Sequence, residues 1–235
     1  ERVMNHLRSK GLIPGDPDPR PFESFYNGYI DLVMSGVEEP LSTHADHFED
    51  AGAYGAAAYQ KGALFLYQLE YVIGKPAFDQ GLLDFFNTWK FKHPDDNDFI
   101  RVMEKYSGLE LDWYRDYMVY SLKTVDYSVD TVFAYQEQSA IILERIRDMP
   151  MPIDVVINTK AGTQLYYTIP LDIMRGAKEE RGPDDKPYEL LHDWNWVNPS
   201  YLFVVPFTPD QIQSVTIDPY MRMLDLDREN NVWAY

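Results

Sequence analysis

The sequence predicts an α+β fold, in which helices come first and an antiparallel β-sandwich follows. Apolar residues recur every three or four positions through about residue 122, which is typical of helices, and every two positions from about residue 126, which is typical of half-buried strands. The 235 residues and 45% hydrophobic content are ample for two packed domains. We therefore expect a helical domain over 1–122 and a β-sandwich domain over 126–235.

The helical part divides at glycines and prolines into separate elements. Helices are expected over 3–10, 22–34, 56–73, 76–89, 95–106 and 111–121. Gly36, Gly74 and Gly108 follow three of them, where a left-handed residue commonly ends a helix. The segment 56–73 is apolar on nearly every face, and its polar residues Gln60, Lys61 and Gln68 form only a narrow strip. Such a pattern indicates a helix buried inside a larger body.

The second half shows the alternation and turn residues of short strands. Strands are expected over 127–135, 140–147, 153–158, 164–169, 201–205 and 211–217. Gly162, Pro170, Pro199 and Pro209 fall between them, where turns belong. Six or seven short strands in a row favour an antiparallel, fibronectin-like sandwich. The charged segment 175–187 is expected to be an exposed loop.

Charge and composition exclude several classes of function. The formal net charge of −17 repels phosphate backbones and argues against nucleic-acid binding. The absence of cysteine excludes disulfides and thiolate zinc sites. No apolar run approaches the ~20 residues of a membrane span. A periplasmic or secreted location is our hypothesis, and a cytoplasmic location stays open. Because the chain starts at Glu1 rather than Met, we interpret it as an excised segment.

Residues 53–117 contain an ordered series of short motifs. They are Tyr59-Gln60-Lys61-Gly62, Leu69-Glu70, Gly74, Phe78, Phe91-Lys92-His93, Asp98-Phe99, Ser107-Gly108 and Leu111-Asp112-Trp113. The series resembles the segment that follows the zinc site in gluzincin metallopeptidases of the aminopeptidase N and leukotriene hydrolase type. The resemblance implies that residues 1–122 form the helical C-terminal part of a thermolysin-like catalytic domain and that the sandwich follows it.

The resemblance assigns a catalytic role to Tyr59. In that family the corresponding hydroxyl points at the peptide carbonyl under attack. A phenol has a pKa near 10 and stays protonated at neutral pH, so it can donate a hydrogen bond to the developing oxyanion. Tyr54 sits five residues earlier, as a second active-site tyrosine does in some relatives. The alternative for Tyr59 is a core tyrosine at the start of a helix.

The family's zinc motif is missing from the sequence. That motif is His-Glu-x-x-His on one helix with a third glutamate ligand, and its first glutamate is the general base. None of the five histidines is followed by glutamate: His6, His44, His47, His93 and His192. We expect the zinc of the parent enzyme to be held by domains outside this chain, and no metal or cofactor site within it. The parent would hydrolyse N-terminal residues from peptides, whereas this chain alone would be inactive.

Two other functions remain open at this stage. The chain could be a non-catalytic interaction module, or part of a pseudo-peptidase, that binds a protein or a glycan. Trp194, Trp196 and Tyr201 could form a platform on which a sugar stacks. Aromatic residues at such spacing more often form one buried face of a strand. A parent with added lipid-epoxide hydrolase activity, as in one branch of the relatives, is disfavoured. That branch uses a further helical domain, whereas here the sandwich directly follows the helices.

Two possible metal sites are also disfavoured. His44 and His47 lie three residues apart beside acidic residues, but in an irregular loop with no evident third ligand. The C-terminal series Asp225, Asp227, Glu229 and Asn230 lacks the glycine and the closing glutamate of a calcium loop.

Overall fold

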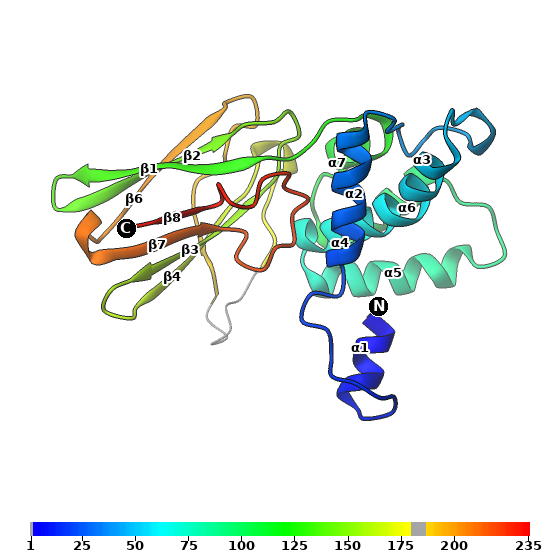
Figure 1. The fold of residues 1–235 in the computed structure, drawn as a ribbon, viewed down its shortest axis with the longest axis horizontal. Coiled ribbons are helices and arrows are strands. Elements are labelled where there is room, and N and C mark those ends of the chain that lie inside the picture. The colour runs from blue at the N-terminus through cyan, green and yellow to red at the C-terminus, as the bar shows by residue number, and fades with distance from the viewer. Residues whose placement is uncertain (1, 180–186) are drawn as a thin grey trace. The chain divides into compact units, whose positions relative to one another are not determined.

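The computed structural model describes residues 2–179 and 187–235, and it has an α+β fold (Figure 1). Two compact units are present, residues 1–66 and residues 67–235, and each is described by itself. The boundary between them falls inside helix α4 (Gly62–Ile73). The domain limits expected from the sequence, 1–122 and 126–235, stay a prediction. No helix in the described residues is long and apolar enough to cross a membrane.

The first unit is helical and has a small apolar core. Its elements are α1 (Arg2–Ser9), α2 (Glu23–Ser35), the 3-10 turn η1 (Ala45–His47), α3 (Ala51–Gly55), the π-helical segment η2 (Ala56–Lys61) and the start of α4. Helix α2 ends as expected, because Gly36 adopts a φ of 73° and donates its N–H to Val33. The core consists of Leu32, Ala53 and Ala57, with Leu41 and Phe48 packed against it.

The helix expected over 56–73 differs from the observed one in two ways. It begins five residues earlier, with α3, because the Asp50 side chain accepts the Ala53 N–H at 2.8 Å and caps the first turn. It also widens to a π-helix over Ala56–Lys61 before α4 continues as an ordinary helix. Lys61 and Gln68, two members of the expected polar strip, are both buried. Their burial agrees with the expectation of an enclosed helix.

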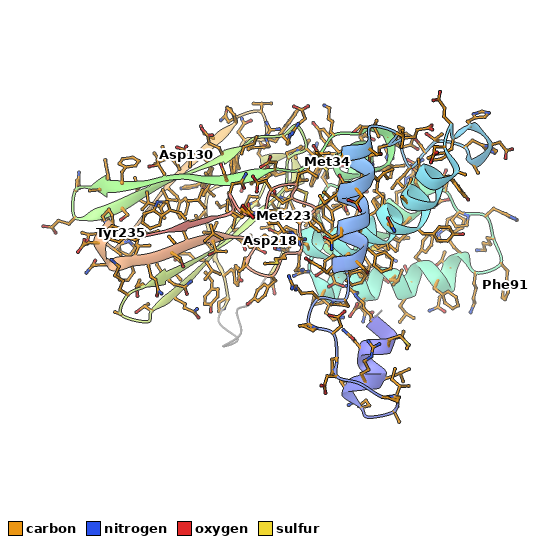
Figure 2. All side chains as sticks on the ribbon, viewed as in Figure 1. Met34, Phe91, Asp130, Asp218, Met223 and Tyr235 are labelled. Carbon is orange, nitrogen blue, oxygen red and sulfur yellow. The ribbon has the colours of Figure 1, made fainter. Side chains whose placement is uncertain are left out.

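The helices of the second unit follow the expected order. After α4 come α5 (Lys75–Trp89), α6 (Asp96–Ser107) and α7 (Asp112–Tyr120). Asp95 and Asp98 form a capping box at the start of α6, which Gly108 ends with a φ of 70°. Helices α5 and α6 approach closely at Gly81, where an added Cβ would lie 2.7 Å from Met103 Sδ. Phe91, in the turn after α5, is fully exposed (Figure 2).

Two open sheets make up the β-region and are consistent with a sandwich; Figure 1 shows them one beside the other. The three-stranded sheet has the order β1 (Tyr127–Tyr135), β2 (Gln138–Arg145), β6 (Ser200–Val205). The five-stranded sheet has the order β5 (Glu189–Leu190), β4 (Gln164–Ile169), β3 (Ile153–Thr159), β7 (Ile212–Ile217), β8 (Val232–Ala234). The 3-10 turns η3 (Asp172–Met174) and η4 (Pro209–Gln211) lie in the connections.

All six expected strands are present, with ends shifted by at most two residues. The sequence missed β5 and did not delimit β8, because two or three residues are too few to show alternation. The pairing of β5 with β4 is parallel, so the second sheet is mixed rather than wholly antiparallel. In the segment 175–187, the expectation of an exposed loop is wrong for Lys178, which is buried; residues 180–186 lie outside the described part.

A buried polar network attaches helix α4 to the sandwich within the second unit. The Tyr71 hydroxyl donates to the Pro152 carbonyl and accepts the Asp154 N–H, each at 3.0 Å. Lys178 Nζ donates to Asp154 Oδ2 at 2.6 Å and to the Tyr71 carbonyl at 2.8 Å. A charged side chain is tolerated in the protein interior only when it is paired. Lys178 can be buried because Asp154 supplies the opposite charge.

Residues of the possible sugar platform and of the possible calcium loop have structural roles in the sandwich. Trp194 is buried and edge-on to Tyr127, so it belongs to the core rather than to an exposed sugar platform. Asp225 is fully buried and its oxygens accept the Tyr127 and Asp227 N–H groups. Asp218 closes another turn, where it accepts the Met223 N–H at 2.6 Å (Figure 2).

Candidate active site

Tyr59 lies in the π-helical segment η2 and is largely exposed, with 72% of its surface accessible. Within this chain Tyr59 is therefore not part of a packed core. A π-helix is rare and occurs mostly as a single widened turn inside an α-helix, frequently at a functional site. The wider turn alters the direction in which successive side chains leave the helix. The exposed phenol of Tyr59 is thus carried on the one stretch of unusual backbone in its helix.

Tyr54 lies one segment earlier, on α3, and is also exposed. Its ring packs edge-on against Phe48, with the centroids 5.4 Å apart. Phe48 in turn packs on the core of the first unit. The ring of Tyr54 is therefore supported from one side, while 37% of the residue's surface stays accessible.

The opposite side of the π-helical segment is anchored to the first unit. Ala57 is fully buried in the core beside Leu32. Lys61 Nζ forms an ion pair with Glu38 Oε1 at 2.6 Å, and only 3% and 7% of these two side chains are exposed. Gln60 lies so close to helix α2 that a Cβ on Gly28 would collide with its amide. Ala57, Gln60 and Lys61, which flank Tyr59, thus hold the segment in place.

The charge of Glu38 also affects the pKa of Tyr29, a buried tyrosine of helix α2. Burial raises the pKa of Tyr29 above the ordinary range of a phenol, and the negative charge of Glu38 raises it further. The Tyr29 hydroxyl is therefore neutral at physiological pH, and the Glu38 carboxylate faces Lys61 as its counter-ion.

The described residues include one cluster of three potential metal ligands, Glu104, Glu110 and Asp112, whose oxygens lie within 4.8 Å of one another. Burial raises the pKa of Glu104, and the charges of the other two carboxylates raise it further. Glu104 Oε1 accepts the Leu111 N–H at 2.9 Å, so it already serves the turn before α7. A catalytic zinc site normally includes histidine, and this cluster has none. These carboxylates do not fit such a zinc.

The histidine pair of the first unit does not form a metal site either. His44 caps the turn η1, where its Nδ1 accepts the Asp46 N–H at 3.2 Å. The His44 and His47 rings are 5.4 Å apart and the pair belongs to no three-ligand group among the described residues.

The catalytic roles expected for Tyr54 and Tyr59 stay a prediction, and the sequence analysis did not find the contacts that Glu38 and Gly28 make with the π-helical segment. Glu38 lies 23 residues before Lys61, in a loop whose composition carries no signal. The available hint was Lys61 itself, a charged residue in an otherwise apolar helix, because a buried lysine requires an acidic partner.

Comparisons with known proteins find a family match that includes the π-helical segment and the helices after it. Residues 29–118 match the peptidase family M1 domain. Over 47 residues the chain is 45% identical to a leukotriene A-4 hydrolase homolog of Botryotinia fuckeliana, and over 47 residues it is 43% identical to leucine aminopeptidase 2 of Sclerotinia sclerotiorum. These segments amount to 20% of this chain and to 7% and 8% of the relatives.

A solved structure is similar over most of the chain. The crystal structure of Legionella pneumophila aminopeptidase A in complex with aspartic acid covers 83% of this chain with a TM-score of 0.51, at 15% sequence identity. The chain covers 21% of that protein, so it spans a small part of the proteins that it resembles. At this identity the likeness concerns the fold.

The helices and the sheets that follow them therefore share the fold of part of that aminopeptidase. Residues 29–118 resemble the domain of M1-type aminopeptidases, and the two curated relatives point to the same family.

Proposed function

We propose that this chain is part of a zinc-dependent aminopeptidase that releases N-terminal residues from peptides, and that Tyr59 stabilises the oxyanion of the reaction. The observation that carries the proposal is the exposed Tyr59 on a segment whose other side is buried. Tyr59 contributes little to packing within this chain, although its neighbours Ala57 and Lys61 are buried. The family match over residues 29–118 supports the peptide substrate.

The chemistry assigned to this chain is a single hydrogen bond. Attack of water on the peptide carbonyl places negative charge on the carbonyl oxygen, and the Tyr59 O–H donates to that oxygen. The bond becomes stronger as charge develops, so it lowers the barrier more than it strengthens substrate binding. The zinc of such an enzyme activates the attacking water. Its ligands, the general base and the residues that bind the substrate's amino group belong to other parts of the protein.

The test uses the full-length gene product and the Tyr59→Phe variant, which removes one oxygen. Steady-state hydrolysis of amino-acid p-nitroanilides should show kcat lower by about 100- to 1000-fold with KM nearly unchanged. Tyr135→Phe is the matched control, because Tyr135 is an exposed tyrosine on β1, and it should leave both constants unchanged. Equal kcat for Tyr59→Phe and the original protein would reject the role of Tyr59.

Two further results bear on the whole proposal. The 235-residue chain alone should have no peptidase activity, with or without added zinc. The coding sequence upstream of Glu1 should encode His-Glu-x-x-His and a downstream glutamate. An upstream region with those ligands replaced would instead make the protein a non-catalytic scaffold.

A further inference from the structure

The buried ion pair between Lys61 and Glu38 lies next to the exposed tyrosine of η2 and has no role in the chemistry proposed above. Lys61 Nζ and Glu38 Oε1 are 2.6 Å apart, and both side chains are almost completely buried. Removing two charges from water is costly, and an apolar pair of similar volume is often as stable. Stability is therefore a weak reason for an ion pair at this position.

The position of the pair suggests a different reason. Lys61 is the last residue of η2 and Tyr59 lies two residues before it, so their side chains leave the helix on different sides: Tyr59 is exposed and Lys61 is buried. Glu38 comes from the loop that follows α2. The pair therefore ties the C-terminal end of the widened turn to a separate element of the first unit.

A second contact holds the same turn from the α2 side. Gly28, in the middle of α2, has no side chain, and Gln60 occupies the space that a Cβ there would fill. Ala57 anchors the N-terminal end of the turn in the core. An ordinary α-helix would need no such contacts, whereas a π-helical turn is the less stable backbone and persists when its surroundings fix it.

We infer that Lys61 and Glu38 are positioning residues, whose ion pair holds the π-helical turn in the register that aims the Tyr59 hydroxyl at the substrate carbonyl. This inference rests on the proposed function of Tyr59. Both side chains are almost completely buried, so we expect neither to contact the substrate. The pair supplies a contact of fixed length and direction, which an apolar contact of equal volume would not provide.

The test is a double-mutant cycle in the full-length enzyme. Lys61→Met should lower kcat by about tenfold or more with little change in KM, because a displacement of about 1 Å at a catalytic group costs up to 10²-fold. Tyr59→Phe combined with Lys61→Met should be no slower than Tyr59→Phe alone, because Lys61 acts through the hydroxyl that is already absent. Multiplicative losses in the double variant would overturn the inference.

Two variants separate positioning from folding. Lys61→Met with Glu38→Leu leaves no buried charge, so it should regain thermal stability while kcat remains at least several-fold low. Recovery of kcat together with stability would overturn the inference. Lys178→Met is the matched control: it breaks a 2.6 Å ion pair with Asp154, also with both side chains buried, in the second unit. It should lower the Tm and leave kcat unchanged.

A structural readout completes the test. Amide hydrogen exchange over residues 56–62 should become faster in Lys61→Met and unchanged in Lys178→Met; unchanged exchange in both would overturn the inference. The outcome for Tyr59→Phe is independent. If that variant keeps full kcat, the proposed function of Tyr59 fails; if it loses kcat and Lys61→Met does not, only the positioning role fails.

Discussion

The hydroxyl of Tyr71 should contribute more to stability than an average tyrosine hydroxyl, because it satisfies two buried backbone groups. It donates to the Pro152 carbonyl and accepts the Asp154 N–H, each at 3.0 Å, and the side chain is 1% exposed. Burial raises the pKa of Tyr71, so the hydroxyl stays protonated. Tyr71→Phe removes this one oxygen and keeps the ring over which Lys178 Nζ lies at 3.7 Å.

The expected cost follows from the two groups left without a partner. Each unsatisfied buried group costs about 1–3 kcal/mol, so we expect the two groups together to cost about 2–6 kcal/mol. For a chain of this length, about 1 kcal/mol corresponds to about 2–4 °C in Tm. Urea unfolding at 25 °C, followed by tryptophan fluorescence, and calorimetry should therefore both detect the change.

Two other tyrosines serve as comparisons. The Tyr127 hydroxyl has the same arrangement, since it accepts the Met151 N–H at 2.8 Å and donates to the Met151 carbonyl at 3.3 Å, and Tyr127→Phe should cost a similar amount. The Tyr166 hydroxyl donates to the Gln164 side chain in an exposed contact, so Tyr166→Phe should cost under about 0.5 kcal/mol. If Tyr71→Phe cost no more than Tyr166→Phe, the reasoning from buried backbone partners would be refuted.

Two more predictions concern the second unit. Burial raises the pKa of Asp225 to about 7. Between about pH 4 and pH 7 the folded chain then holds a proton that the unfolded chain has released, so stability should fall as pH rises through that window, by up to about 1.4 kcal/mol per pH unit. Asp225→Asn should remove this slope, and urea midpoints at pH 5 and pH 8 measure it; an unchanged slope would contradict the shift. Gly81→Ala should destabilise by about 1 kcal/mol despite its better helix propensity, because the new methyl group must displace the buried Met103. A stabilised variant in thermal unfolding would show that α5 and α6 have room to adjust.

Much of the fold could be predicted from local sequence signals. The capping box of Asp95 and Asp98 and the left-handed Gly36 and Gly108 set helix ends through contacts within a few residues. The strands of five residues or more were found because their alternation is long enough to recognise. The motif series between residues 53 and 117 also predicted the resemblance to the peptidase family whose domain matches residues 29–118.

The local signals failed where a distant partner decides the outcome. Lys178 belongs to a charged segment that suggests a surface loop, yet it is buried, because Asp154, 24 residues away, supplies the opposite charge. The parallel pairing of β5 depends on β4 and on no feature of its own two residues. The π-helical turn has no sequence signature, since its residues would form an ordinary α-helix as well.

The sequence by itself determined the α+β class, most element boundaries and the resemblance to a peptidase family, since these depend on periodicity, on local hydrogen bonds and on an ordered motif. It also predicts a role for Tyr59. Only the tertiary structure decided that Tyr59 is exposed on a widened turn and that Lys61 is buried against Glu38. The physical reason is that burial and pairing are properties of residues brought together by folding. A charged side chain has the same local sequence whether water or a carboxylate 23 positions away surrounds it.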